Sequence, residues 1–491
     1  MGKYLRIHPD DNVMVLLEDG IKGSTFNGIT LIDDVPKAHK VALKDILEHE
    51  HVIKYGHPIG HATKFIKKGA HVHTHNVATN LGEVLSYTYE PEFKTVVVDE
   101  PIRNVWVYER EHGEIGIRNE LWIIPTVGCI NGQAQQIAKT FMASKEISQF
   151  FDGVYVFGHP FGCSQMGDDL INTKETLQNI ALHPNAGGVL ILGLGCENNQ
   201  VEAFKSSYVY NPKRTRFLTM QDVSDEIETA TNLLEELYQN LVHDQRREVP
   251  ISRLNIGLKC GGSDGFSGIT GNPLLGKLSD YITFHGGTTL LTEVPEMFGA
   301  EKILMKRAKN KEVFDKTVAL INNFKHYYQS HNQVIYDNPS PGNKQGGITT
   351  LEDKSLGCTQ KGGMSLVTDV LKHTERLKTQ GLNLISAPGN DLISVTTLGM
   401  AGCHMVLFTT GRGTPFGGFI PTLKVSTNTE LYQKKPNWID YNAGQLVDGT
   451  SMDETLSGLI DFIVDVASGK KTSNEKNNFR EIAIFKDGVT L

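Results

Sequence analysis

Three apolar runs that each end in a Gly-Cys pair constrain the fold more than any other feature of the chain. The runs end at Cys129, Cys163 and Cys196, and the spacings of 34 and 33 residues are about the length of one strand–helix unit. Helical patterns at residues 133–144 and 173–182 fit between the runs. Strands that alternate with helices predict a parallel sheet whose strand ends meet at one edge. We expect the three thiols near that edge, although cysteines packed in a core would give the same pattern.

The C-terminal half repeats this arrangement. An apolar run at residues 254–258 stops at a glycine-rich turn, residues 260–265, and the run at 288–292 ends in Glu293 and Glu296. Open α/β sheets bind ligands in loops of this kind, at the carboxyl ends of the strands. Tight turns alone would explain any one such loop, but the recurrence favours a site. Two further apolar runs also end in polar loops: residues 382–385 and 405–408.

The length and the changes in pattern along the chain indicate a multidomain α/β protein. A chain of 491 residues is too long for one hydrophobic core. Short apolar runs separated by glycines predict a β-rich start, and acid-proline pairs without helical periodicity predict an extended linker. We expect a small β module at residues 1–85, a linker at 86–104, a middle α/β domain at 105–245 and a C-terminal α/β domain at 246–491.

Charge and motifs exclude several classes of function. The net charge of −8 argues against nucleic acid or an anionic membrane as a main partner. No apolar run is long enough to span a bilayer, and the first residues lack the apolar core of a signal peptide. Six cysteines without CxxC pairs indicate free thiols and a cytoplasmic setting. The chain contains no P-loop, dinucleotide fingerprint or HExxH motif.

Local patterns predict further elements. Helices are expected at residues 43–47, 222–243 and 452–467, and strands at 105–108 and 481–485. The stretch 336–361 is polar and predicts a long functional or disordered loop. Within it, Thr349 and Thr350 followed by Glu352 and Asp353 resemble a helix capping box.

Three histidines alternate at His71, His73 and His75. Alternate residues of a strand share one face, so the three imidazoles would point the same way. Such a group suits a metal or an anionic substrate. A histidine-rich strand on a solvated sheet face would give the same pattern.

Longer segments resemble the altronate and galactarate dehydratase family over essentially the whole chain. The resemblance implies an N-terminal SAF module of β-clip type, a middle domain that forms a homodimer and a C-terminal Rossmann-like domain with a metal site. It also implies iron(II)- or manganese(II)-dependent dehydration of the sugar acid D-altronate to 2-dehydro-3-deoxy-D-gluconate in hexuronate breakdown, with galactarate as the alternative substrate. The segments are HVHTHN, ELWIIPTVGCINGQAQQIA, HPFGCSQMGDD, LGLGCENNQ, CGGSDGFSGITGNPLLG, TEVPEMFGAE, NPSPGNKQGGITTLEDKSLGCTQK and GRGTPFGG.

Within these segments we assign roles from residue chemistry. A metal that holds an α-hydroxy acid acidifies the α-proton and stabilises the enediolate formed when that proton leaves. A base must then be a positioned lysine or histidine, and the arginine fork suits a carboxylate. The predicted metal ligands are Cys260, Asp264, Glu293 and Asp353. The predicted substrate-binding residues are Arg412, Asn343 and Lys344. The predicted catalytic residues are Lys354 as base, with His73 and His75 as acid toward the departing hydroxyl.

Two alternatives remain open from the sequence. Cys129, Cys163 and Cys196 on separate strand ends could hold an iron–sulfur cluster, as in an iron–sulfur dehydratase. The chain could also be a regulator that binds a sugar acid without turning it over. No DNA-reading helix supports the second alternative.

Overall fold

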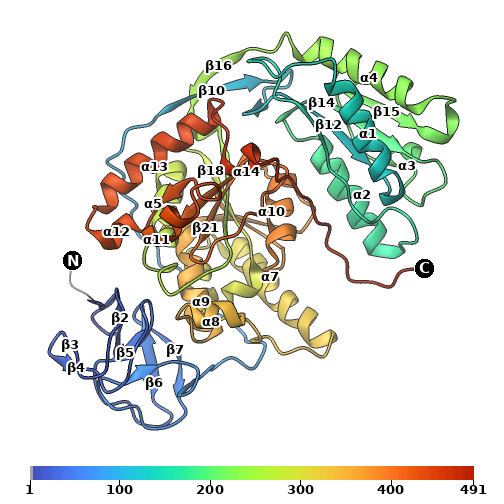
Figure 1. Cartoon of the computed structure of the whole chain (residues 1–491). Coiled ribbons are helices and arrows are strands. Elements are labelled where there is room, and N and C mark those ends of the chain that lie inside the picture. The colour runs from blue at the N-terminus through green and yellow to red at the C-terminus, as the bar shows by residue number, and fades with distance from the viewer. Residues whose placement is uncertain (1–3) are drawn as a thin grey trace.

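The computed structural model describes residues 4–491, which fold into three bodies (Figure 1). A small β module, drawn in blue, lies against one end of the large C-terminal domain. The middle domain, in teal and green, lies at the other end (Figure 1). Within the described residues, no helix is both long and apolar enough to cross a membrane.

The N-terminal module is built from short antiparallel strands, which confirms the predicted β-rich start. Its sheets have the orders β1-β2-β5-β8 and β6-β7-β9, and β3 pairs with β4. The predicted helix at residues 43–47 is wrong, because Ile46 is fully buried in a β-bridge with Ile66. The strands are β1 (Tyr4–Leu5), β2 (Val13–Leu16), β3 (Thr25–Phe26), β4 (Ile29–Thr30), β5 (Lys40–Ala42), β6 (His51–Lys54), β7 (His57–Ala62), β8 (His71–Val72) and β9 (Val77–Ala78).

Residues 79–103 contain no helix or strand and run along the C-terminal domain. Two tyrosines fasten this segment. Tyr87 Oη donates a hydrogen bond to Glu301, and Tyr89 Oη donates one to the carbonyl of Ala308. The segment is therefore an attached strap.

The middle domain contains a four-stranded parallel sheet of order β13-β12-β14-β15, as the strand–helix alternation predicted. Alternate residues of β12 face opposite ways: Leu121 packs with α1 and α4, whereas Trp122 packs toward α2 and the C-terminal domain. An antiparallel sheet of order β11-β10-β16 joins the two domains. The elements are β10 (Asn104–Glu109), β11 (Ile115–Gly116), β12 (Glu120–Pro125), η1 (Gly128–Ile130), α1 (Asn131–Met142), β13 (Val154–Val156), α2 (Gly167–Ala181), β14 (Ala186–Gly193), α3 (Val201–Ser206), β15 (Thr215–Thr219), η2 (Met220–Asp222), α4 (Glu226–Leu241), β16 (Arg246–Pro250) and η3 (Ile251–Arg253).

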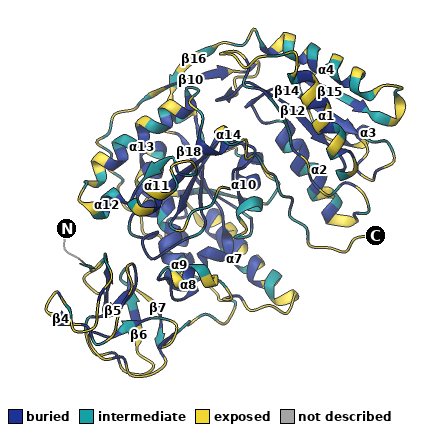
Figure 2. Cartoon of the chain, in the orientation of Figure 1, coloured by how far each residue is buried: buried dark blue, intermediate teal, exposed yellow. Residues whose placement is uncertain are grey.

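The C-terminal domain is built on a seven-stranded parallel sheet of order β19-β20-β18-β17-β21-β22-β23. Its central strands are buried on both faces, as expected where helices cover each side (Figure 2). The elements are β17 (Asn255–Cys260), α5 (Gly271–Phe284), β18 (Thr288–Leu291), η4 (Val294–Met297), α6 (Glu301–Met305), α7 (Lys311–Ser330), α8 (Pro341–Gln345), α9 (Leu351–Cys358), η5 (Thr359–Gly362), β19 (Val367–Leu371), β20 (Gly381–Ile385), α10 (Asp391–Met400), β21 (Met405–Thr410), β22 (Thr422–Ser426), α11 (Thr429–Lys434), β23 (Tyr441–Asn442), α12 (Gln445–Asp448), α13 (Met452–Ala467) and α14 (Ser473–Lys476).

Two predictions for this domain are wrong. The stretch 336–361 is not a loop, because it contains α8, α9 and η5. The Thr350 side chain caps α9 by accepting a hydrogen bond from the Asp353 amide. The strand expected at residues 481–485 is also absent, because these residues make a single bridge, at Glu481. The tail then runs on to the middle domain, where the amides of residues 487 and 488 bind Asp169.

A buried ion triad fastens the N-terminal module to α9. Lys40 Nζ lies 2.8 Å from one carboxylate oxygen of Asp353, and Lys54 Nζ lies 3.0 Å from the other. Burial alone would raise the pKa of Asp353, but the two ammonium groups lower it below its ordinary value. Lys40 Nζ also donates to the carbonyl of Gly347. Gly347, in the turn before α9, and Asp353, in the first turn of α9, are thus both tied to the module.

We predict that Asp353→Asn destabilises the docked module by about 3–5 kcal/mol, because it leaves two buried ammonium groups without a counter-charge. Urea unfolding measures this loss, and faster proteolysis within residues 79–103 reports undocking. The matched control is Asp315→Asn, which removes an exposed ion pair with Lys311 and is expected to cost under about 1 kcal/mol. Equal stability of the two variants would contradict the proposed role of the triad.

Candidate active site

A cavity of about 690 Å³ opens at the carboxyl edge of the seven-stranded sheet. Its walls come from the loops after β17, β18 and β20 and from the segment 334–344, which leads into α8. Cavities of this size hold small ligands. The polar lining includes Cys260, Glu296, Asn343, Lys344, Lys354 and Asp391.

Four buried metal-ligand side chains cluster at this cavity, and we call them its floor: Cys260 and Glu296 line the cavity, and Glu293 and Cys358 lie against them. One ligand atom of each lies within 4.8 Å of the others. Cys260 ends β17 and the two glutamates follow β18, so adjacent parallel strands bring them together, while Cys358 arrives at the end of α9. Glu293 has a left-handed backbone with φ of 65°, a conformation that costs free energy and is often found at functional sites.

Two buried lysines and the partly buried Lys354 compensate the acids of the floor. Lys259 Nζ and Lys361 Nζ each lie 2.5 Å from a different oxygen of Glu293. Lys354 Nζ lies 2.9 Å from Glu296 Oε1. Burial would raise the pKa of Glu296, but Lys354 and Lys259 lower it to about 2.

Lys354 is further held by the side-chain carbonyls of Asn338 and Asn343, at 3.0 and 3.1 Å. Burial alone would lower the pKa of Lys354, but the nearby negative groups, Glu296 first, raise it. Its ammonium form is therefore favoured in this arrangement.

The pKa values of the two thiols of the floor are shifted in opposite directions. Their sulfurs lie 3.7 Å apart, with Cys358 as hydrogen-bond partner of Cys260. This hydrogen bond lowers the pKa of Cys260 and raises that of Cys358. Lys361 Nζ lies 2.9 Å from Cys260 Sγ and 3.0 Å from Cys358 Sγ, which favours the thiolate at Cys260.

The chemistry of this donor set fits a transition-metal ion. Two sulfurs with two carboxylates suit iron(II) better than magnesium, which prefers oxygen alone. The ammonium of Lys361 lies against the same sulfurs, so a bound cation requires this side chain to withdraw or to lose its proton. With that movement, Cys260, Glu293, Glu296 and Cys358 can hold one ion beside the cavity.

Of the four residues predicted as metal ligands, the structure places Cys260 and Glu293 in this floor. Asp264 lies apart, and its carboxylate accepts hydrogen bonds from Ser267, Thr427 and Asn428. Asp353 belongs to the ion triad with the module.

The predicted substrate-binding residues divide between the wall and the rim. Asn343 and Lys344 line the cavity, and the amide nitrogen of Asn343 donates to the carbonyl of Ser263. Arg412 is exposed beside a neighbouring cavity, where its guanidinium donates to the side chain of Gln345 at 3.0 Å. Two of the three predicted residues therefore line the main cavity.

Of the predicted catalytic residues, only Lys354 lines the main cavity. His73 lies at the seam between the module and the C-terminal domain, where its Nδ1 is 3.2 Å from Thr349 Oγ1. His75 is exposed, with its ring 5.3 Å from that of His71.

Four residues of the floor and its surroundings were not predicted from the sequence: Lys259, Glu296, Cys358 and Lys361. One signal was available. Glu296 follows Glu293 by three residues, within one turn of η4. Lys259, Cys358 and Lys361 could not be assigned from the sequence, because they come together only where α9 and η5 cover the end of β17.

The thiols of Cys129, Cys163 and Cys196 are exposed at one edge of the middle sheet, which favours the strand-end interpretation over packing in a core. In the described part of the chain, two groups of three or more ligand atoms lie within 4.8 Å, and neither includes these sulfurs. In the described part of the chain, these three sulfurs are thus not arranged as a preformed ligand set for an iron–sulfur cluster.

Comparison with known proteins agrees with the three bodies of the fold. Residues 2–80 match the altronate/galactarate dehydratase SAF domain, and residues 107–242 match the second domain of D-galactarate dehydratase/altronate hydrolase. Residues 251–490 match the C-terminal domain of D-galactarate/altronate dehydratase.

Full-length relatives extend this result. The chain is 54% identical to the altronate dehydratase of Escherichia coli (strain K12) and 54% identical to that of Bacillus subtilis (strain 168), with all of each chain covered. It is 32% identical to the galactarate dehydratase (L-threo-forming) of Escherichia coli (strain K12), over 98% of this chain and 96% of that one. The chain belongs to the altronate and galactarate dehydratase family.

Proposed function

We propose that this chain dehydrates D-altronate to 2-dehydro-3-deoxy-D-gluconate and water. The choice of substrate rests on the 54% identity, over the full length, to two altronate dehydratases, compared with 32% to a galactarate dehydratase. The cavity supports the reaction class, because it places lysines and a buried metal-ligand set beside a space for a small acid. Galactarate is the alternative substrate.

The floor residues Cys260, Glu293, Glu296 and Cys358 would hold iron(II) or manganese(II). Bound there, the ion would supply a Lewis acid for the carboxylate and α-hydroxyl of the substrate and stabilise enediolate charge. Thiolate donors favour iron(II) of the two.

The protein's own residues would bind the acid and move the proton. Lys344, on the cavity wall, would pair with the substrate carboxylate. Lys354 Nζ would accept the α-proton once Glu296 is engaged elsewhere, because Glu296 is the group that most favours its ammonium form. Asn338 and Asn343 would keep that nitrogen in place. Arg412 would lie at the mouth of the site. Because His73 and His75 lie outside the cavity, the departing hydroxyl would take its proton from Lys354 and leave as water.

We further propose a cytoplasmic homodimer. Six free cysteines support a reducing compartment. The middle domain exposes large apolar side chains such as Ile147 and Val209, which supports a subunit contact there. A monomer in sedimentation experiments at micromolar concentration would contradict the homodimer.

Metal-stripped protein, assayed anaerobically, should form a 2-keto acid from D-altronate only after iron(II) or manganese(II) is restored. D-Mannonate and galactarate are offered separately under the same conditions. Turnover of galactarate instead would retain the reaction and change the substrate. If the folded protein forms no keto acid with either metal, the proposal is overturned in favour of a sugar-acid-binding regulator.

Lys354→Met should lower kcat by about 10²–10⁴-fold, the usual contribution of a positioned base, while metal content stays unchanged. The matched variant Lys344→Met, on the same wall, should mainly raise KM because it removes a carboxylate partner. Steady-state kinetics on iron-loaded protein separate the two effects. A Lys354→Met enzyme with near wild-type kcat would remove Lys354 from proton transfer.

A further inference from the structure

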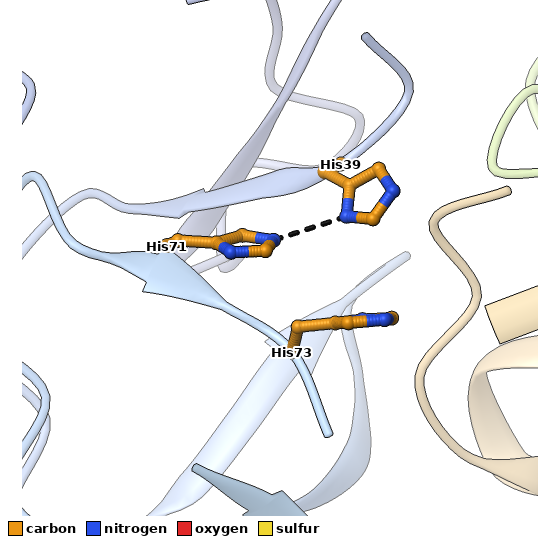
Figure 3. A group of neighbouring side chains, drawn as sticks. All are labelled: His39, His71 and His73. Atoms are coloured by element: carbon orange, nitrogen blue, oxygen red, sulfur yellow. Dashed lines mark hydrogen bonds between the residues drawn. The ribbon is translucent and has the colours of Figure 1, made fainter. Parts of the chain in front are cut away.

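Three histidines of the N-terminal module converge at its seam with the C-terminal domain (Figure 3). His39 Nδ1 lies 3.0 Å from His71 Nε2, and the ring of His73 stacks on that of His71 with centroids 5.5 Å apart. The centroids of His39 and His73 are 4.8 Å apart. One ring nitrogen of each lies within 4.8 Å of the others, so the three imidazoles can reach a common ion.

The remaining ring nitrogens of two of these histidines are fixed by the C-terminal domain. His39 Nε2 lies 3.1 Å from the carbonyl of Gln345, and His73 Nδ1 lies 3.2 Å from Thr349 Oγ1. Protein metal sites use such outer hydrogen bonds to orient imidazole ligands. The bond from His39 Nε2–H leaves the lone pair of Nδ1 directed at His71.

We propose that His39, His71 and His73 bind a divalent transition-metal ion such as zinc, at a second site that shares no residue with the floor of the cavity. Three imidazoles are a complete protein ligand set for zinc, with a further position left for solvent. His71 and His73 are only partly buried, so an ion can enter from solvent.

The electrostatics of the seam permit this site. Burial, aided by the charge of Lys40 and by the other histidines, lowers the pKa of His71 to about 4 and that of His73 to about 3. Both imidazoles are therefore neutral at pH 7, as metal ligands must be. The charge of Lys40 is itself compensated by Asp353.

An ion at this trio would fix the module to the segment that shapes the cavity. Gln345 and Thr349, which hold the outer nitrogens of the trio, flank the turn between α8 and α9. Asn343 and Lys344 precede this turn, and Lys354 follows it. The site would therefore stabilise the docked arrangement, and it does not depend on the reaction proposed above.

Anaerobic cobalt(II) titration of the metal-stripped full chain tests the proposal. A cysteine site also absorbs in the visible but adds a thiolate-to-cobalt charge-transfer band, so the histidine equivalent is the part of the visible absorption that rises without that band. We expect one such equivalent per chain. His71→Ala and His39→Ala should weaken it at least tenfold, whereas His51→Ala, an exposed histidine on β6 of the same module, should not.

Two further measurements protect the test against misfolding. Zinc should raise the Tm of the wild type and of His51→Ala by more than that of His71→Ala, in which only the cavity floor could still bind it. If His71→Ala differs from the wild type in its metal-free circular dichroism, His73→Gln replaces it. A wild type without the histidine equivalent, or a folded trio variant that keeps it, would overturn the proposal and leave the trio as a hydrogen-bonded seam.

Discussion

The carboxylate of Asp353 lies between the ammonium groups of Lys40 and Lys54, all buried where the N-terminal module meets α9. Unpaired charges cannot remain in such a place, because desolvation costs several kcal/mol per ion. The pairing thus dictates how the module docks. It also fixes the start of α9, the helix that places Lys354 in the cavity wall and Cys358 in the floor.

The same constraint organises the cavity floor. Glu293 is compensated by Lys259 and Lys361, and Glu296 by Lys354. Asp391 lies 2.9 Å from Lys259, so three carboxylates face the three lysines without a further cation. An added cation changes this balance, so metal binding and the protonation of the lysines must be linked. The proposed proton transfer by Lys354 therefore depends on whether Glu296 pairs with Lys354 or binds the metal.

Much of the scaffold could be predicted from the sequence because it depends on local patterns. The apolar runs predicted parallel strands, and the helix expected at residues 452–467 coincides with α13. Cys260 and Glu293 were found because strand order brings the ends of adjacent strands together. Predictions from local residue chemistry failed where the burial of a segment decides its structure. A capped polar stretch looks like a loop until α9 is seen to bury Leu351 and Leu356.

Asp353 shows why the rest could not be predicted. Its partners are 313 and 299 residues away in the chain, and no local pattern encodes such pairs. Adjacent residues of a helix point about 100° apart, so Asp353 faces the module while Lys354 faces the cavity. The two residues are adjacent in the sequence, so the sequence alone could not show that they belong to different sites. Cys358, one turn further on, shares the side of Lys354.

We propose that the floor of the cavity holds the metal on which dehydration depends. Anomalous diffraction at the iron edge, from crystals of the active iron-loaded enzyme, tests it most directly. The account predicts an iron peak bounded by Cys260, Glu293, Glu296 and Cys358, with Lys361 withdrawn from the sulfurs. Active crystals with iron elsewhere and none among these four residues would contradict it.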